Sequence, residues 1–236
     1  MSVARWEDEL AARLARAITA GDILTDGRLP SERELSTRFD VSRARLRIAL
    51  DALEAGGLIY RRQGKGTFAA PPTVTSGGRL DRLAREVTPQ DIMEVRLEIE
   101  PALAALAASR ATDEELDRLR QLTDATRDLK DRAAYERADE AFHYRIAVAS
   151  RNPLFLQVYD SIRTVRKLAS WGMVREESHS PEVMTRFGDQ HARLFDTIAA
   201  RDMAGAAGEM ERHLMDVHRV VTRGVHRIGA LARDGG

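Results

Sequence analysis

Four side chains in the second half of the chain have the types and spacing of a metal-binding set. Asp139 and His143 are four residues apart, so on a helix they share one face about one turn apart. His191 lies eleven residues before Asp202, and His213 lies eleven residues after it. If two antiparallel helices meet at Asp202, both imidazoles lie at the same level and can converge on one ion. One aspartate and three histidines suit a borderline divalent metal such as Zn²⁺, Mn²⁺ or Ni²⁺.

The same spacing has simpler explanations, and spacing alone leaves them open. An aspartate four residues before a histidine is often only a surface hydrogen bond, and core histidines are commonly satisfied by backbone groups. The other histidines, His179, His218 and His226, show no such symmetry, and we expect them on the surface. The chain has no cysteine, so any metal must be held by nitrogen and oxygen, and disulfides and thiolate nucleophiles are excluded.

A second set of candidate functional residues is basic and lies near the N-terminus. Residues 42–66 carry six basic side chains against two acidic ones. Ser42 can cap a helix whose inward-facing residues are Leu46, Ala49, Leu50 and Leu53. Three arginines near its start then face solvent or a partner: Arg43, Arg45 and Arg47. Such a helix can enter the major groove of DNA, where arginine donates two hydrogen bonds to guanine. Taken alone, the three arginines are more readily explained as a solvated face, but the adjoining basic hairpin favours DNA.

The elements that would position these arginines can be read from the first 70 residues. A stripe with a period of four predicts a first helix ending near Gly21: Trp6, Leu10, Leu14 and Ile18. Ser31 and Glu34 form a capping box that starts a second helix, and Gly56-Gly57 ends the third. Two short apolar segments then flank the basic tip 62–66, which predicts a β-hairpin. This order predicts a winged helix-turn-helix.

The rest of the chain has a helical pattern without a convincing strand. The Pro/Gly/Ser-containing stretch 71–78 breaks both periodicities, and we assign residues 71–88 to a linker between domains 1–70 and 89–230. We expect helices at 89–110, 113–131, 133–150, 153–175, 181–200 and 202–230. The fold class is therefore mostly α: three helices and a small hairpin, followed by an all-helical bundle large enough to enclose a ligand.

Charge and hydrophobicity bear on which classes of function are possible, in particular nucleic-acid and membrane binding. The 236 residues hold 37 basic and 37 acidic side chains, and neutrality at first argues against nucleic acid. The charge is uneven, because residues 1–70 hold 12 basic and 10 acidic groups whereas residues 79–236 hold 25 and 27. No apolar run exceeds the seven residues Ala102–Ala108, and the first ten residues lack the apolar core of a signal peptide. We expect no membrane partner and a cytoplasmic location.

The N-terminal motifs closely resemble the DNA-binding domain of the GntR family of bacterial transcription regulators. The matching segments are Leu29–Leu35, Val41–Arg43, Gly57–Ile59 and Gly64–Phe68. The resemblance implies operator contacts from Arg33, Arg43 and Arg47, a phosphate contact from Ser42 and a minor-groove contact from the wing tip Gln63, Gly64 and Lys65. Asp40 departs from the family, which usually has glycine in this turn. Arg45 also replaces a small polar residue, and we expect it to add a contact to DNA.

The C-terminal motifs resemble the FCD ligand-binding domain of the FadR subgroup of that family. The matching segments are Asp139–His143, Ser150–Pro153 and 191–214. Many members hold a divalent metal through one aspartate and three histidines, and the four candidate ligands match that set. Such members commonly bind small carboxylates. Arg96 matches an arginine that can anchor the carboxylate, although a helical ion pair with Glu100 explains Arg96 equally well.

Together these observations predict a homodimeric, ligand-responsive transcriptional regulator. We expect a repressor that binds double-stranded operator DNA at a pseudo-palindrome and is controlled by a small effector, a carboxylate, bound at a divalent metal. We do not expect an enzyme. Two alternatives remain at this stage: a regulator that senses the metal itself, and a metal-dependent hydrolase.

Overall fold

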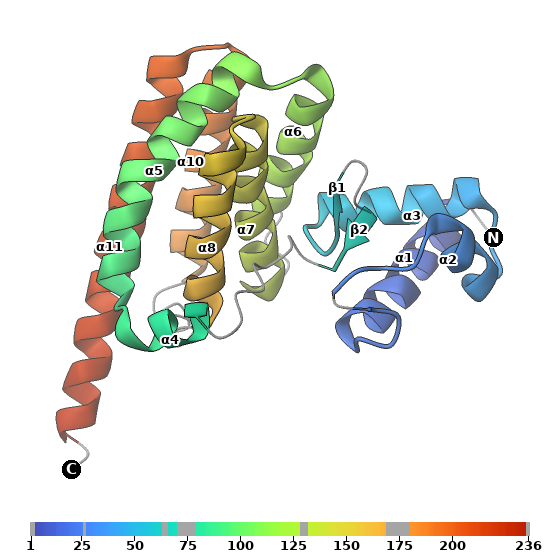
Figure 1. Cartoon of the computed structure of the whole chain (residues 1–236), viewed down its shortest axis with the longest axis horizontal. Coiled ribbons are helices and arrows are strands. Elements are labelled where there is room, and N and C mark those ends of the chain that lie inside the picture. The colour runs from blue at the N-terminus through green and yellow to red at the C-terminus, as the bar shows by residue number, and fades with distance from the viewer. Residues whose placement is uncertain are drawn as a thin grey trace.

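Helices dominate the structure, a computed structural model that describes residues 3–25, 27–62, 66–69, 79–127, 132–168 and 180–234. Within these residues the only sheet is a two-stranded hairpin near the N-terminus. Figure 1 shows a small N-terminal unit beside a larger helical bundle. The predicted fold class, a winged helix-turn-helix followed by an all-helical domain, is confirmed. No helix in the described ranges is long and apolar enough to cross a membrane.

The N-terminal unit packs three helices and the hairpin around an aliphatic core. Its elements are α1 (Val3–Thr19), α2 (Glu32–Phe39), α3 (Arg43–Ala55), β1 (Tyr60–Arg62) and β2 (Gly66–Phe68). The strands are antiparallel, with Tyr60 opposite Phe68. The core contains the residues predicted to face inward, including Leu10, Leu14, Ile18, Leu46, Ala49, Leu50 and Leu53. Burying these side chains holds α3 against α1 and leaves Arg43, Arg45 and Arg47 exposed to solvent.

The turn between α2 and α3 is set by two serine caps and one left-handed residue. The Ser31 hydroxyl accepts the Glu34 N–H at 3.3 Å, and the Glu34 carboxylate accepts the Ser31 N–H at 2.9 Å, so the predicted capping box is confirmed. Asp40 ends α2 with φ of 54°, a conformation that glycine adopts without strain. Ser42 then caps α3 by accepting the Arg45 N–H at 3.4 Å.

The bundle is built around α7, its most deeply buried helix. Its described helices are α4 (Arg79–Glu86), α5 (Pro89–Arg110), α6 (Asp113–Arg127), α7 (Arg132–Ala149), α8 (Pro153–Leu168), α10 (Pro181–Ala199) and α11 (Met203–Asp234). Helices α5, α6 and α8 all pack on α7, while α10 and α11 pack on each other and on α5. Because α7 is covered on several sides, most residues from Ala138 to Ala149 are buried, polar ones included.

For the six helices predicted after residue 88, the observed boundaries lie within one residue of the predicted ones wherever the structure describes the residues concerned. Exceptions are the ends predicted at residues 131 and 175, which fall outside the described residues, and α11, which extends to Asp234. One difference concerns the segment 71–88 assigned to the linker. Its second half contains α4, whose Ala84 is buried in the bundle core against α8. Structurally, the bundle therefore begins at residue 79.

Candidate metal centre and nucleic-acid interface

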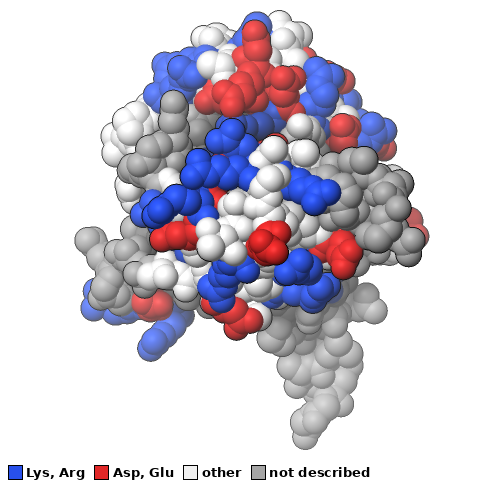
Figure 2. Space-filling view, turned by 90° about the vertical axis from the view of Figure 1, so that its right-hand side faces the viewer, with Lys and Arg blue, Asp and Glu red and all other residues white. Residues whose placement is uncertain are grey.

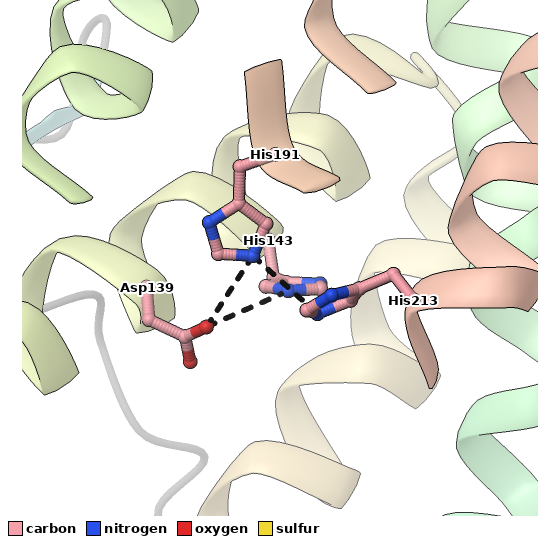
Figure 3. A group of neighbouring side chains, drawn as sticks. All are labelled: Asp139, His143, His191 and His213. Atoms are coloured by element: carbon pink, nitrogen blue, oxygen red, sulfur yellow. Dashed lines mark hydrogen bonds and ion pairs between the residues drawn. The ribbon is translucent and has the colours of Figure 1, made fainter. Parts of the chain in front are cut away.

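Three helices bring the four predicted metal ligands together in the interior of the bundle. α7 supplies Asp139 and His143, α10 supplies His191, and α11 supplies His213 (Figure 3). One donor atom from each residue lies within 4.8 Å of all the others. All four side chains are buried, and the two histidines of α10 and α11 are completely shielded from solvent. The two antiparallel helices meet at Asp202, as the symmetric spacing predicted.

Each histidine uses its Nδ1 atom for a protein partner. The ionised carboxylate of Glu100 accepts the His143 Nδ1–H at 2.7 Å. The Thr126 hydroxyl gives its own proton to the Thr123 carbonyl, so it accepts the His191 Nδ1–H at 3.3 Å. The amide oxygen of Gln190 accepts the His213 Nδ1–H at 2.8 Å. These partners hold all three imidazoles as Nδ1–H tautomers, whose Nε2 lone pairs are free for the centre.

The Nε2 atoms and the Asp139 carboxylate meet without a hydrogen between them. The His191 Nε2 lies 3.4 Å from the His213 Nε2 and 3.5 Å from the Asp139 Oδ1. The His143 Nε2 is 3.8 Å from the same oxygen and has no hydrogen-bond partner. Donors about 2.0–2.1 Å from a tetrahedral ion lie about 3.4 Å from one another. The arrangement therefore fits a cation at its centre.

Burial keeps the imidazoles of His191 and His213 neutral. It lowers the pKa of His191 to about 3, although Asp139 acts in the opposite direction. Burial, and then the neighbouring imidazoles, also lower the pKa of His213 well below its ordinary value of 6.5. Neutral imidazole is the form that binds metal, so an incoming cation does not have to displace protons from these two residues near neutral pH.

Arg96 takes part in this network through Glu100. Its Nε donates to Glu100 Oε1 at 2.5 Å, and the other carboxylate oxygen accepts from His143. Burial alone would raise the pKa of Glu100, but Arg96 and His143 outweigh it and lower that pKa to about 2. Arg96 thus forms the ion pair that was the alternative to a ligand-facing role. The helical spacing of Arg96 and Glu100 predicts this pair, but not the link from Glu100 to His143, which lies 43 residues further along the chain.

Two other supporting residues carried no sequence signal. Thr126 and Gln190 are ordinary helix residues whose roles appear only when α6, α10 and α11 are packed. Arg166 of α8 is also buried, and its Nη2 lies 3.7 Å from Asp139 Oδ2, the carboxylate oxygen on the side away from the histidines.

The candidate DNA-binding residues lie at the exposed start of α3 and on α2. Arg43, Arg45 and Arg47 are all exposed, as is Arg33 on α2. Arg47 pairs with Glu32 at 2.9 Å, yet its side chain keeps 67% of its surface accessible. Figure 2 shows acidic groups among the basic ones at this end of the molecule, consistent with the small net charge of residues 1–70. The wing-tip residues Gln63, Gly64 and Lys65 lie outside the described residues.

A winged helix-turn-helix joined to a helical domain with a buried polar centre defines a class of protein: DNA-binding transcriptional regulators with a ligand-binding domain. Comparison with known families agrees. Residues 7–69 match the family described as bacterial regulatory proteins, gntR family, and residues 91–216 match the FCD domain. The chain belongs to the GntR family and carries an FCD domain. It is a transcriptional regulator and not an enzyme, which removes the hydrolase alternative.

Named relatives extend this agreement over nearly the whole chain. The HTH-type transcriptional regulator LutR of Bacillus subtilis is 30% identical over 87% of this chain and 96% of its own length. The HTH-type transcriptional repressor NanR of Cronobacter sakazakii is 30% identical over 80% of this chain and 75% of its own length. Among solved structures, Escherichia coli McbR/YncC shares the fold with a TM-score of 0.51 at 17% identity, covering 92% of this chain and 97% of its own.

Proposed function

We propose that this protein is a homodimeric repressor whose operator binding is controlled by a small carboxylate metabolite bound at a divalent metal ion. Asp139, His143, His191 and His213 would hold the ion, and the vacant coordination positions would receive the effector. The ion would act as a Lewis acid that anchors an anionic oxygen. We place this action in the cytoplasm, where a bacterial regulator meets its operator.

The observation that carries the metal proposal is the facing pair of imidazole lone pairs. His191 and His213 present their Nε2 atoms to each other at 3.4 Å, and both Nδ1 protons are already used. Without a cation the two lone pairs repel, and the Asp139 carboxylate adds a negative charge beside them. A purely structural cluster would place a donor opposite an acceptor. A set of nitrogen and oxygen donors favours Zn²⁺, Mn²⁺ or Ni²⁺.

The charge of the buried region supports an anionic effector. Three neutral histidines and one aspartate leave a net charge of +1 around a divalent ion. The Arg96–Glu100 pair is neutral and does not change this charge. An uncompensated positive charge in a buried site is costly, and a carboxylate on the ion neutralises it. In this proposal Arg96 keeps its ion pair with Glu100, which uses its Nε atom, and also contributes to the effector site alongside the metal, as the family resemblance implies.

The DNA proposal rests on the exposed arginines of α2 and α3. Arg33, Arg43, Arg45 and Arg47 would contact bases or phosphates, and Ser42 at the start of α3 would contact a phosphate. The wing tip Gln63–Lys65 would reach the minor groove. A dimer is proposed because two recognition helices must meet two half-sites about one helical turn apart. The repressor role is supported by relatives that carry this name, such as NanR.

Metal content after purification tests the metal site directly. We expect the wild-type protein to retain about one divalent ion per chain after dialysis, measured by elemental analysis, and His191→Ala to lose it. His218→Ala is the matched control, because His218 lies on α11 outside the cluster and should leave the metal content unchanged. Equal metal content in wild type and His191→Ala would refute the assignment.

A thermal-shift screen of small carboxylates tests the effector proposal. Stabilisation is expected only for metal-loaded protein, and it should disappear after treatment with EDTA. A regulator that senses metal alone behaves differently, because its operator affinity follows the free metal concentration and no carboxylate changes it. The two results distinguish an anchored effector from a metal signal.

A further inference from the structure

The N-terminal unit touches the bundle through a buried ion pair at the end of α3. Glu54 is 8% exposed and accepts the Arg61 backbone N–H at 3.0 Å. The same carboxylate accepts a hydrogen bond from the guanidinium of Arg145, a buried residue of α7. Both charges are removed from water, so losing Glu54 leaves Arg145 buried without a counter-charge. Losing Arg145 leaves Glu54 only the Arg61 guanidinium, at 3.4 Å. The pair therefore joins the recognition helix to the helix that carries two candidate metal ligands.

Aromatic contacts strengthen the same junction. The Arg145 guanidinium lies 4.1 Å from the centre of the Tyr60 ring, at the start of β1. Tyr60 meets Tyr144 of α7 edge to face, with ring centres 4.8 Å apart. The guanidinium of Arg163, on α8, lies 4.7 Å from the centre of the Tyr144 ring. Arg163 also pairs with Glu140, the residue after Asp139. Cation–π and edge-to-face contacts are directional, so they restrict how the hairpin can turn on α7.

Gly57 shows how closely the two units approach. Its φ of 69° is left-handed. A Cβ at this position would lie 2.7 Å from the Arg137 carbonyl oxygen and 3.1 Å from the Ala141 Cβ, both on α7. Only glycine satisfies the backbone conformation and the space together. The turn between α3 and β1 is thus seated directly on α7.

The contacts fall on one face of α7, and the metal ligands fall on the other. The face that meets the N-terminal unit contains Arg137, Ala141, Tyr144 and Arg145. At about 100° per residue, this face points roughly opposite to Asp139 and His143. One rigid helix therefore has the DNA-binding unit on one side and the candidate metal centre on the other.

We propose that Arg145 and Glu54 are positioning residues that hold the recognition helix on α7 in its operator-binding orientation. This inference rests on the proposed function, because it assigns the route by which the effector site controls DNA binding. The junction holds α3 at its C-terminal end, at Glu54, whereas Arg43 lies at the other end, about 17 Å away along the helix axis. A rotation of about 10° at the junction moves Arg43 by about 3 Å, which is enough to break its hydrogen bonds to bases. A small movement of α7 is thereby amplified at the DNA.

The proposal is tested by measuring the operator affinity of the full-length variants Arg145→Gln and Glu54→Gln against that of the wild type. We use a duplex selected by the wild-type protein and a shorter duplex that carries one half-site. Each variant is expected to bind the full pseudo-palindrome about tenfold more weakly and the half-site with wild-type affinity. The double variant should be no weaker than the singles, because all three remove one contact. Arg145→Lys should recover part of the affinity.

Two controls make the result specific. Arg151→Gln removes a comparable arginine from an exposed pair with Glu115 and should leave binding unchanged. Metal content should equal that of the wild type in every variant, which separates the junction from the metal site. Full-site affinity of Arg145→Gln equal to or above wild type contradicts the proposal. If the wild type itself does not prefer the full site to the half-site, the proposed dimeric function fails instead.

A distance measurement tests the junction without DNA. The absence of cysteine allows spin labels at introduced Ala52→Cys and Ser109→Cys, both exposed positions, one in each unit. Labelled protein is diluted into unlabelled protein so that each dimer carries one pair. A narrow distance distribution is expected, and Gly57→Ala should broaden or shift it. Gly21→Ala is the matched control, because Gly21 has φ of 80° but no neighbour in the path of a Cβ. Identical distributions for both glycine variants contradict the proposed junction.

Discussion

At the scale of single residues, the bundle interior controls which atom of each histidine is available. Glu100, Thr126 and Gln190 each occupy one Nδ1 atom, and this leaves the three Nε2 atoms as the donors. Side chains from other helices therefore define the geometry of the proposed ligands. Glu100 has a second task, because it neutralises the buried Arg96.

Glu100→Gln should weaken metal binding without removing any ligand. The amide still accepts the His143 Nδ1–H, but it lacks the charge that makes the imidazole more basic. We expect the metal affinity to fall about 10-fold, measured by chelator competition. Thermal stability should also fall, because Arg96 loses its counter-charge. Glu94→Gln on the same helix, an exposed position, serves as the control. An unchanged chelator midpoint would show that Glu100 does not tune the site.

The low pKa of His191 predicts how the metal-free protein responds to acid. Its pKa is about 3 in the folded protein and about 6.5 when unfolded. As the pH falls below 6.5, the unfolded chain takes up a proton that the folded protein does not, so stability present at pH 7 is lost. At pH 5 this loss is about 2 kcal/mol from His191, and His213 adds to it.

Urea unfolding of EDTA-treated protein at pH 7 and pH 5 measures this effect. His191→Asn should reduce the difference in unfolding free energy between the two pH values, and His218→Asn should not. A pH-independent wild type would contradict the assigned protonation states.

At the scale of elements, the turn between α2 and α3 shows how one backbone conformation sets the recognition helix. Asp40 adopts the left-handed region where the family usually has glycine. The Asp40 N–H donates a hydrogen bond to the Thr37 carbonyl, and the Val41 N–H donates one to the Ser36 carbonyl. The turn is therefore closed by backbone hydrogen bonds. The aspartate keeps this geometry but places an acid beside the DNA-facing helix.

Substitutions at Asp40 separate the backbone effect from the charge effect. Asp40→Ala should destabilise the protein by about 1 kcal/mol, because alanine tolerates positive φ less well, while Asp40→Gly should be close to neutral. Both remove a negative charge, so both should raise operator affinity at low salt by a similar factor. Chemical denaturation and fluorescence anisotropy measure the two effects. Equal stabilities of the two variants would contradict the backbone argument.

At the scale of the whole molecule, a neutral chain combines an exposed set of arginines with a slightly acidic bundle. Residues 79–236 carry two more acidic than basic groups, so they give no general attraction to DNA. Attraction has to come from the N-terminal unit, where acidic groups also interrupt the basic ones (Figure 2). This favours weak non-specific binding and makes correct placement of α3 important.

Operator affinity should therefore decrease steeply with salt and depend on α3. We expect Arg43→Ala to weaken operator binding about 10- to 100-fold and to affect a random duplex less, because a base contact is lost. Arg118→Ala, on the bundle helix α6, is the control and should bind as the wild type does. Anisotropy titrations at several salt concentrations measure both the salt dependence of operator affinity and the affinity loss caused by Arg43→Ala. Equal losses on operator and random DNA would assign Arg43 to phosphate instead.

The sequence by itself determined the elements other than α4 and the identity of the clustered residues. Helix starts depend on neighbours three residues apart, as in the Ser31–Glu34 box, so local spacing was sufficient to predict them. The symmetric placement of His191 and His213 about Asp202 likewise followed from helix geometry. Partners on other helices could not be predicted this way, because their contacts depend on how each helix is rotated in the bundle.

Only the tertiary structure decided that Glu100 holds His143 and that Glu54 meets Arg145 across 91 residues of chain. It also showed that residues 79–86, assigned from the sequence to the linker 71–88, form a helix that packs on the bundle. The physical reason is the same in each case. Local propensity and periodicity act over one or two helical turns, whereas a buried charge is positioned by whichever helices pack around it, and that packing is a property of the whole chain.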